Sequence, residues 1–376
     1  MKHNLIDEKY MQIALSLSKR NEGKTWPNPA VGCVITNGVG ATGNPLIVGT
    51  GSTNIGGRPH AEIVALKQAG LAASGATVYV TLEPCSHFGV TDPCVKSLIS
   101  SNIRKVVSAM KDPNPKVNGN GYAMLKENGI EVVHGCLEKE AKETHKGFLS
   151  NIYKSRPWIS LKLALSSDMK IGKYKEERIK ITNTESDRYT HVLRSKYDAI
   201  LIGSNTYRND NPKLTVRLSG LNDYSPVRVI LSSKGDIADS SELFKEIERA
   251  PLWIFVDSDI EDKIFNDLNK KGAKVIKMTT NKNHQFDLGK VFNKLASFGI
   301  NNLLVEGGAK LADNMFELNL IDDMYLFKND KIIGNDGIAL NSITKIDNKI
   351  INESFKKSSV KSFGNDRLYY YNKLKA

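Results

Sequence analysis

The stretch GGRPHAEIVALKQAG (residues 56–70) begins with a Gly-Gly turn and continues as a helix that is expected to start near His60. His60 and Glu62 then lie in the first turn, two residues apart. A lone histidine at such a place is ordinarily a capping or surface residue, and a lone glutamate is a first-turn carboxylate favoured by the helix dipole. The pair therefore indicates chemistry only if the rest of the chain supplies partners for it.

Two cysteines supply those partners. The stretch TLEPCSHFGVTDPC (residues 81–94) puts Cys85 and Cys94 directly after prolines, where helices tend to begin and where thiolates are stabilised. One imidazole and two thiolates suit zinc and leave a fourth position for water, which is typical of catalytic sites. We therefore predict that His60, Cys85 and Cys94 bind zinc and that Glu62 carries protons to and from the water. His87 is the less favoured rival ligand.

Composition restricts the class of protein. The chain has 376 residues, enough for two domains, with 40% hydrophobic and 25% charged residues. No apolar run approaches the roughly 20 residues of a membrane span, and the charged first 20 residues do not resemble a signal peptide, so a cytoplasmic location is expected. In that compartment the cysteines should not form structural disulfides, and Cys33 and Cys136 are expected to be buried. The net charge of +12 is spread along the chain, as on a lysine-rich surface or in a protein that binds phosphorylated ligands.

Hydrophobic periodicity divides the chain in two. Up to about residue 148, strand-like runs at 30–36, 75–82, 103–110 and 130–135 alternate with helix-like stretches, the first of them an amphipathic N-terminal helix. Residues 150–160 resemble a join, and a new strand begins at Trp158. Further buried strands are expected at 198–205, 227–233, 251–257, 273–278 and 300–308, with a closing edge strand at 361–375. Both segments are therefore α/β.

Several longer motifs resemble those of one family. The order His-x-Glu followed by Pro-Cys is the signature of zinc deaminases, although here eight residues separate the two cysteines instead of two. That spacing resembles the bifunctional riboflavin-biosynthesis deaminase–reductases of the cytidine-deaminase superfamily. The resemblance is carried by NPAVGCVI (28–35), HAE (60–62), GATVYVTLEPCSHFG (75–89), TDPC (91–94) and DPNPKVNGNG (112–121), and in the second segment by WISLKLALSSD (158–168), residues 192–217, VRVILSS (227–233) and LLVEGGAKLADNMF (303–316).

The resemblance implies a fold and a reaction sequence. A cytidine-deaminase-like three-layer domain would span residues 1–148, and a dihydrofolate-reductase-like domain would span residues 149–376. The first domain would replace the ring 2-amino group of a diaminopyrimidinone carrying ribosylamine 5-phosphate, using zinc. The second would reduce the ribosyl group to ribityl, using NADPH. We expect this small phosphorylated pyrimidine as the substrate, no nucleic acid or membrane as a partner, and a homo-oligomer, a dimer or larger.

Roles carried over by matching position follow from the same resemblance. The substrate residues would be Asn28, Arg178, Arg194, Leu214, Arg217 and Glu306. The cofactor residues would be Ala164, Lys180, Thr206, Asp210, Ser233, Gly308, Ala309, Lys310, Leu311, Ala312, Asp313 and Asn314. The Gly-Gly turn at 307–308 before a helix would let backbone N–H groups approach a phosphate. Lys162, Asp210 and Glu306 are candidates for moving protons at the sugar.

Departures from the family pattern leave alternatives open. Asp92 replaces a proline before Cys94, Met169 stands where glycine is usual, Arg178 replaces a serine, and Lys180 replaces a tryptophan. These changes allow a chain whose deaminase is active and whose reductase is weak or lost. Two further alternatives are a tRNA or other nucleic-acid deaminase, which would suit the charge, and a non-catalytic zinc-stabilised binding module, which would have no use for Glu62.

Overall fold

The computed structural model describes residues 4–173, 179–340 and 354–374. The chain forms two compact units, residues 1–155 and 156–376. The predicted join at residues 148/149 lies inside helix α6 (Lys146–Lys154), so the units divide just after that helix. Within the described residues, no helix has the length and apolar character that crossing a membrane requires.

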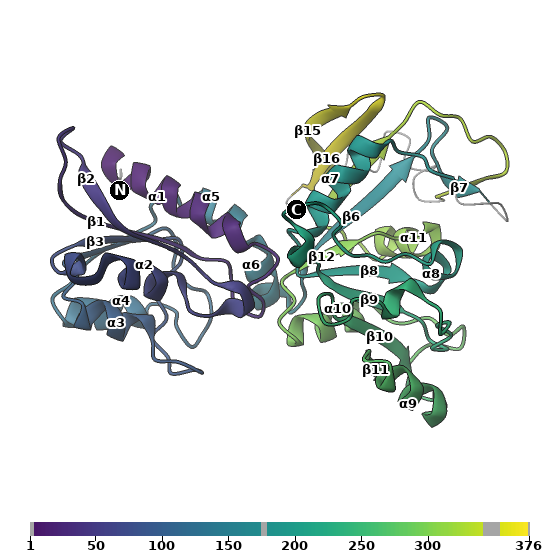
Figure 1. The fold of residues 1–376 in the computed structure, drawn as a ribbon, viewed down its shortest axis with the longest axis horizontal. Helices are drawn as coiled ribbons and strands as arrows, with labels where there is room; N and C mark the ends of the chain where they lie inside the picture. The colour runs from purple at the N-terminus through teal and green to yellow at the C-terminus, as the bar shows by residue number, and fades with distance from the viewer. Residues whose placement is uncertain (1–3, 174–178, 341–353, 375–376) are drawn as a thin grey trace. The chain divides into compact units, whose positions relative to one another are not determined.

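The first unit is a five-stranded sheet with helices on both faces, seen in Figure 1 as α1 and α5 on one side and α2, α3 and α4 on the other. The strand order is β2-β1-β3-β4-β5, where β1 is antiparallel to β2 and β3, and β3, β4 and β5 are parallel. The elements are α1 (Leu5–Ser18), β1 (Gly32–Val39), β2 (Pro45–Ser52), α2 (Ala61–Ala69), β3 (Thr77–Val80), α3 (Cys94–Ser100), β4 (Lys105–Ser108), α4 (Asn120–Glu127), β5 (Glu131–His134), α5 (Glu138–Thr144) and α6. The expected three-layer architecture is confirmed.

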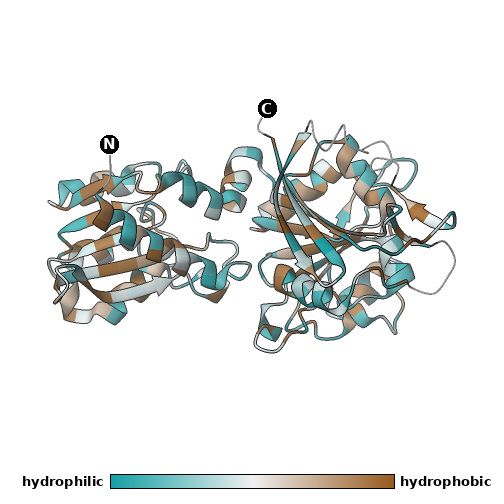
Figure 2. Ribbon diagram, turned by 90° about the horizontal axis from the view of Figure 1, so that it is seen from above, coloured by the Kyte–Doolittle hydropathy of each residue, from teal (hydrophilic) through white to brown (hydrophobic). Residues whose placement is uncertain are grey.

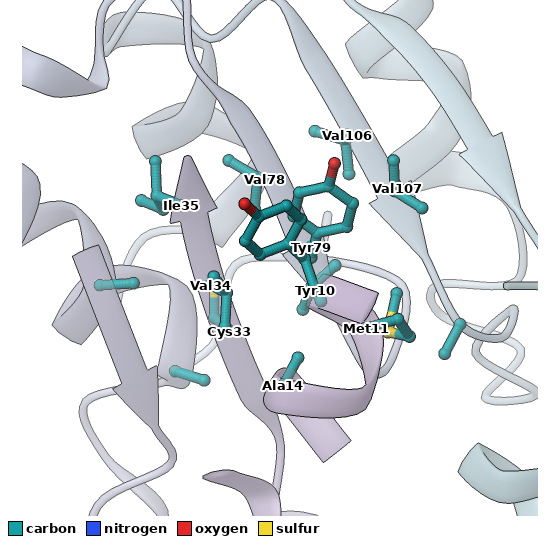
Figure 3. Packing of buried hydrophobic residues seen from close by; sticks show 14 of the residues in the cluster. Tyr10, Met11, Ala14, Cys33, Val34, Ile35, Val78, Tyr79, Val106 and Val107 are labelled. Atoms are coloured by element: carbon teal, nitrogen blue, oxygen red, sulfur yellow. The ribbon is translucent and has the colours of Figure 1, made fainter. Parts of the chain in front are cut away.

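The core of this unit lies between α1 and the sheet. Tyr10, Met11 and Ala14 project from α1 onto buried residues of β1, β3 and β4 (Figure 3), and the rings of Tyr10 and Tyr79 lie 5.2 Å apart. Both strand faces are buried because helices cover both sides. In Figure 2 the helices carry both hydrophobic and hydrophilic residues, as expected for helices that pack one face on the sheet. Cys33 and Cys136 are fully buried in this core, as expected, and none of the four cysteines forms a disulfide.

Strand β2 was not predicted, and it positions the helix that carries His60. An added Cβ at Gly49 or Gly51 would lie 2.4 or 2.1 Å from a backbone oxygen of α2, so only glycine allows the two backbones to pack this closely. The strand has exposed apolar residues at its start and small residues at its end. It therefore lacks the alternation of apolar and polar residues by which a strand is recognised in a sequence.

The second unit contains a nine-stranded sheet of order β11-β10-β9-β8-β12-β6-β13-β16-β15, parallel from β11 to β13 and antiparallel at β16 and β15. Its strands are β6 (Trp158–Leu165), β7 (Lys170–Lys173), β8 (Ala199–Gly203), β9 (Val227–Leu231), β10 (Leu252–Asp257), β11 (Lys274–Met278), β12 (Asn302–Val305), β13 (Asp323–Lys328), β14 (Gly337–Ala339), β15 (Phe355–Phe363) and β16 (Asp366–Lys373). Its helices are α7 (Thr184–Arg194), α8 (Ser204–Asp210), α9 (Asp262–Lys270), α10 (Leu288–Ser297) and α11 (Ala309–Glu317). Strands β7 and β14 form a separate pair.

The tail differs from the single closing strand that the sequence predicts. Residues 355–373 form a hairpin of β15 and β16, joined at Gly364, whose φ of 54° suits a tight turn. Strand β16 pairs with β13, and β15 forms the edge. The prediction was wrong here because β15 is mostly exposed and lysine-rich, which is common in edge strands and weakens their apolar pattern.

Candidate active sites

Three elements of the first unit bring together the predicted zinc ligands. His60 is the N-cap of α2, Cys94 is the first residue of α3, and Cys85 lies in the loop after β3. The ligand atoms of the three residues lie within 4.8 Å of one another. His60 Nδ1 lies 3.3 Å from Cys94 Sγ and 3.6 Å from Cys85 Sγ. One nitrogen and two sulfurs therefore face a common point, and this donor set fits zinc.

Although helices tend to start after proline, Cys85 lies in a loop and does not begin a helix. Its sulfur nevertheless lies at a helix start, because the backbone N–H of Cys94 donates to Cys85 Sγ over 3.3 Å. A hydrogen bond from the Cys94 thiol, together with His60, lowers the pKa of Cys85 to about 4, and the same hydrogen bond with burial raises the pKa of Cys94. Cys85 is therefore a thiolate, the form that binds metals.

Glu62 lies beside this cluster without belonging to it. It is only 4% exposed, and its carboxylate is hydrogen-bonded to Cys94. Burial, followed by the charge of Cys85, raises the pKa of Glu62. A buried acid held next to metal ligands suits a proton carrier.

The two other predicted residues of this site lie in different surroundings. Asn28 Nδ2 donates to the carbonyl of Gly57 over 2.8 Å and lies 3.5 Å from His60 Nε2, on the side of the imidazole opposite the sulfurs. His87 is exposed and is not part of the metal-ligand cluster.

Sequence reasoning missed Glu83, which connects this site to the loop of residues 112–121. Glu83 is 3% exposed, and its carboxylate accepts from the backbone N–H groups of Asp112, Gly119 and Gly121 over 2.9–3.1 Å. Because Glu83 stands two residues before Cys85, it ties the metal loop to the start of α4. The sequence offered one sign of this contact. An acidic residue stands just before Pro-Cys, and the loop at 112–121 contains glycines whose backbone N–H groups could bind a carboxylate.

In the second unit, predicted substrate residues meet at the carboxyl ends of the parallel strands. Arg194 and Glu306 form a two-pronged ion pair, with Nε–Oε1 at 2.7 Å and Nη2–Oε2 at 2.8 Å. Arg194 Nη1 and Arg217 Nη1 both donate to the carbonyl of Thr215, over 3.2 and 3.3 Å. Leu214, with φ of 56°, is buried directly before Thr215. The structure thus assembles a cationic cluster from residues that are far apart in the sequence.

Electrostatics decide the charge states in this cluster. Burial raises the pKa of Glu306, but Arg194 outweighs burial and brings it to about 2. Burial and the nearby arginines lower the pKa of His191, which sequence reasoning missed, to about 4. Its Nδ1 accepts from the backbone N–H of Arg217 over 3.3 Å. At neutral pH, Glu306 is therefore an anion and His191 is neutral, so Glu306 suits binding better than proton donation.

The predicted cofactor residues follow the same sheet edge. Thr206 lies on α8 after β8, Ser233 follows β9, and Gly308 is the N-cap of α11 after β12. A Cβ on Gly308 would come within 3.0 Å of Thr206 Oγ1, so the two residues are neighbours. The start of α11 has no side-chain cap and no acid in its first turn, which leaves N–H groups for an anion. These features fit the phosphates of NADPH.

Other predicted residues of the second unit lie as follows. Lys162 and Ala164 are half-buried on β6, where Lys162 Nζ lies 5.4 Å from the ring centre of Phe327, and Asp210 ends α8. The residues from Ala309 to Asn314 form most of α11. Lys180 is exposed and forms an ion pair with Asp187 over 2.6 Å. Arg178 lies outside the described residues.

Met169, which stands where the family has glycine, occupies a turn with φ of 59°. The left-handed region favours glycine, and this explains the family residue at that position. Asp168 holds the same turn by accepting from Ser166 Oγ and from the backbone N–H groups of Ile333 and Gly334.

Comparison with known proteins identifies the family. Residues 157–369 match the RibD C-terminal domain, and residues 5–110 match the cytidine and deoxycytidylate deaminase zinc-binding region. The chain is 38% identical to riboflavin biosynthesis protein RibD of Aquifex aeolicus, covering 97% of this chain and 98% of that protein. It is 33% identical to RibD of Escherichia coli, with coverage of 96% and 97%. The chain belongs to the RibD family. Among solved structures, RibD of Acinetobacter baumannii matches with a TM-score of 0.84 at 30% identity, covering 98% of this chain and 99% of that one.

Membership of the RibD family confirms several predictions. The chain is a bifunctional enzyme of riboflavin biosynthesis, with a cytidine-deaminase-like domain and a reductase domain. The predicted cofactors, zinc and NADPH, are confirmed for this family. The nucleic-acid deaminase and the non-catalytic zinc module are correspondingly disfavoured.

Proposed function

We propose that the first unit deaminates 2,5-diamino-6-(5-phosphoribosylamino)pyrimidin-4(3H)-one and that the second unit reduces the ribosyl group of the product to ribityl. A solved protein of Thermotoga maritima, 31% identical with a TM-score of 0.80 and 98% of this chain covered, is described as a diaminohydroxyphosphoribosylaminopyrimidine deaminase/5-amino-6-(5-phosphoribosylamino)uracil reductase. The observation that carries the proposal is the convergence of His60, Cys85 and Cys94 beside the buried Glu62.

In the deaminase unit, His60, Cys85 and Cys94 would hold zinc. When bound, the ion lowers the pKa of water so that hydroxide is available at neutral pH. Glu62 accepts one proton of the attacking water and passes it to the ring nitrogen. It then accepts the second proton, from the new hydroxyl group as that becomes the carbonyl, and delivers it to the leaving amino group. The balance is one water consumed and one ammonia released. Asn28 would orient the pyrimidine next to His60.

In the reductase unit, Gly308 and the first turn of α11 would hold the phosphates of NADPH, with Thr206 and Ser233 alongside. NADPH supplies the hydride for C1 of the ribose. Arg194 and Arg217 would bind the sugar phosphate, since a planar guanidinium matches phosphate geometry. Lys162 and Asp210 are the candidates for delivering a proton to the ring oxygen as the ring opens. We also propose that the protein is a cytoplasmic homo-oligomer.

The test uses the purified protein and the two substrates. Wild type should release ammonia from the diaminopyrimidinone and should oxidise NADPH, followed at 340 nm, when given the deaminated product. If the protein releases ammonia but does not oxidise NADPH, only the deaminase part of the proposal stands. The departures from the family pattern at Met169, Arg178 and Lys180 would then explain the lost reductase activity. Binding of tRNA that weakens steeply with salt would support the nucleic-acid alternative instead.

A further inference from the structure

The largest of the fully buried side chains in the described structure is an arginine, Arg228 on β9, which is 0% exposed. Its guanidinium donates to the carbonyl of Ala250 through Nε and Nη2, over 3.0 and 2.6 Å, and to the carbonyl of Lys213 through Nη1, over 3.2 Å. In the described part of the chain no carboxylate lies within ion-pair distance of it. Burial lowers the pKa of Arg228 to about 10, although the more distant charge of Glu246 acts in the opposite direction. Burial of an arginine without a contacting carboxylate is unfavourable compared with an apolar side chain, so a role beyond packing is indicated.

The carbonyl of Lys213 leads directly to the proposed substrate cluster. Leu214 follows in the left-handed region with φ of 56°, and the chain bends at the next residue, Thr215. The next carbonyl, of Thr215, accepts from Arg194 and Arg217. Arginines therefore hold the segment 213–215 at both ends, Arg228 at the Lys213 carbonyl and the two proposed substrate arginines at the Thr215 carbonyl.

We propose that Arg228 is a positioning residue for substrate binding in the reductase unit. By fixing the Lys213 carbonyl it fixes the bend at Leu214 and Thr215, and this bend sets where the Thr215 carbonyl holds the guanidinium groups of Arg194 and Arg217. This inference rests on the proposed function for the role of those two arginines. The proposed cofactor residues on α8, after β9 and on α11 receive no hydrogen bond from Arg228. A change at Arg228 therefore acts on substrate binding and leaves cofactor binding as it is.

The kinetic test compares Arg228→Met and Arg228→Lys with wild type. Methionine keeps an unbranched side chain but removes every donor, whereas lysine keeps the charge and one donor group. The KM for the deaminated phosphoribosyl substrate should rise about tenfold in Arg228→Met and less in Arg228→Lys, while the KM for NADPH stays unchanged. Ile230→Val is the matched control, because Ile230 is fully buried on the same face of β9 two residues along. It should lower Tm without changing either KM. An unchanged substrate KM in Arg228→Met, or an equal rise in both KM values, overturns the proposal.

Hydrogen exchange tests the positioning without turnover. The backbone N–H groups of Val216 and Arg217 donate to Ser225 Oγ and His191 Nδ1, so they report the order of this segment. In Arg228→Lys, and in Arg228→Met where it folds, a peptide spanning residues 213–218 should exchange about tenfold faster than in wild type, with β8 unchanged. Unchanged exchange at 213–218 refutes the inference even if wild type has no reductase activity. Absence of that activity alone refutes only the proposed reductase function.

Discussion

Replacing Glu83 by glutamine should destabilise the deaminase unit by about 4–6 kcal/mol. The buried carboxylate accepts from three backbone N–H groups, those of Asp112, Gly119 and Gly121. Hydrogen bonds to a charged group contribute about 1 kcal/mol more than neutral ones, so removing the charge weakens the three by roughly 3 kcal/mol together. The new amide NH2 also faces at least one N–H donor, and a buried donor without an acceptor costs about 1–3 kcal/mol.

The assay is urea unfolding followed by tryptophan fluorescence in a Trp158→Phe, Trp253→Phe background. The chain has three tryptophans, so Trp26 then reports the first unit alone. The same comparison should show faster release of zinc to a coloured chelator, because the loop that carries Cys85 loses its anchor. Both measurements are made at equal protein concentration with and without Glu83→Gln.

Glu131→Gln is the control, since it removes the same charge from the same unit. Glu131 is 54% exposed in its ion pair with Lys105, and exposed pairs contribute about 0–1 kcal/mol. If Glu83→Gln shifts the free energy of unfolding no more than Glu131→Gln does, the three hydrogen bonds do not stabilise the unit as argued.

Three other perturbations have outcomes set by the structure. Glu62→Gln should keep its zinc by metal analysis and reduce ammonia release by about 10²–10⁴-fold, with NADPH oxidation of the deaminated product unchanged as its control; an active variant would exclude Glu62 as the proton carrier. Burial lowers the pKa of His145 from 6.5 to about 4, so the native state favours the neutral ring. The contribution of His145 to the free energy of unfolding is complete above pH 6.5 and declines as the pH falls to 4. The decline is about 1.4 kcal/mol per pH unit and about 3 kcal/mol in total. Urea unfolding at pH 7 and 5 should show this slope, and His145→Gln should remove it. Glu306→Gln should destabilise the second unit by about 3–5 kcal/mol, because Arg194 stays buried without its counter-charge; an unchanged Tm would show that the pair is solvated.

Local chemistry explains why the metal centre could be predicted. A histidine at a helix N-cap, an acid in the next turn and a cysteine after proline each have a signature within a few residues of sequence. The glycine-glycine turn before α11 is equally local. For Cys85 the proline rule does not identify the element, because Cys85 lies in a loop and its partner at a helix start is the backbone of Cys94, nine residues away.

The sequence by itself determined which residue types are available for the two chemistries, since metal-ligand and turn signatures depend on neighbours along the chain. Only the tertiary structure decided which distant residues pair with one another through ion pairs and hydrogen bonds. Arg194 meets Glu306 across 112 positions, Glu83 meets Gly119 across 36, and Arg228 meets Ala250 across 22. Such contacts leave no periodic trace in the sequence, because burial and hydrogen-bond geometry are properties of the packed sheet and not of any single segment.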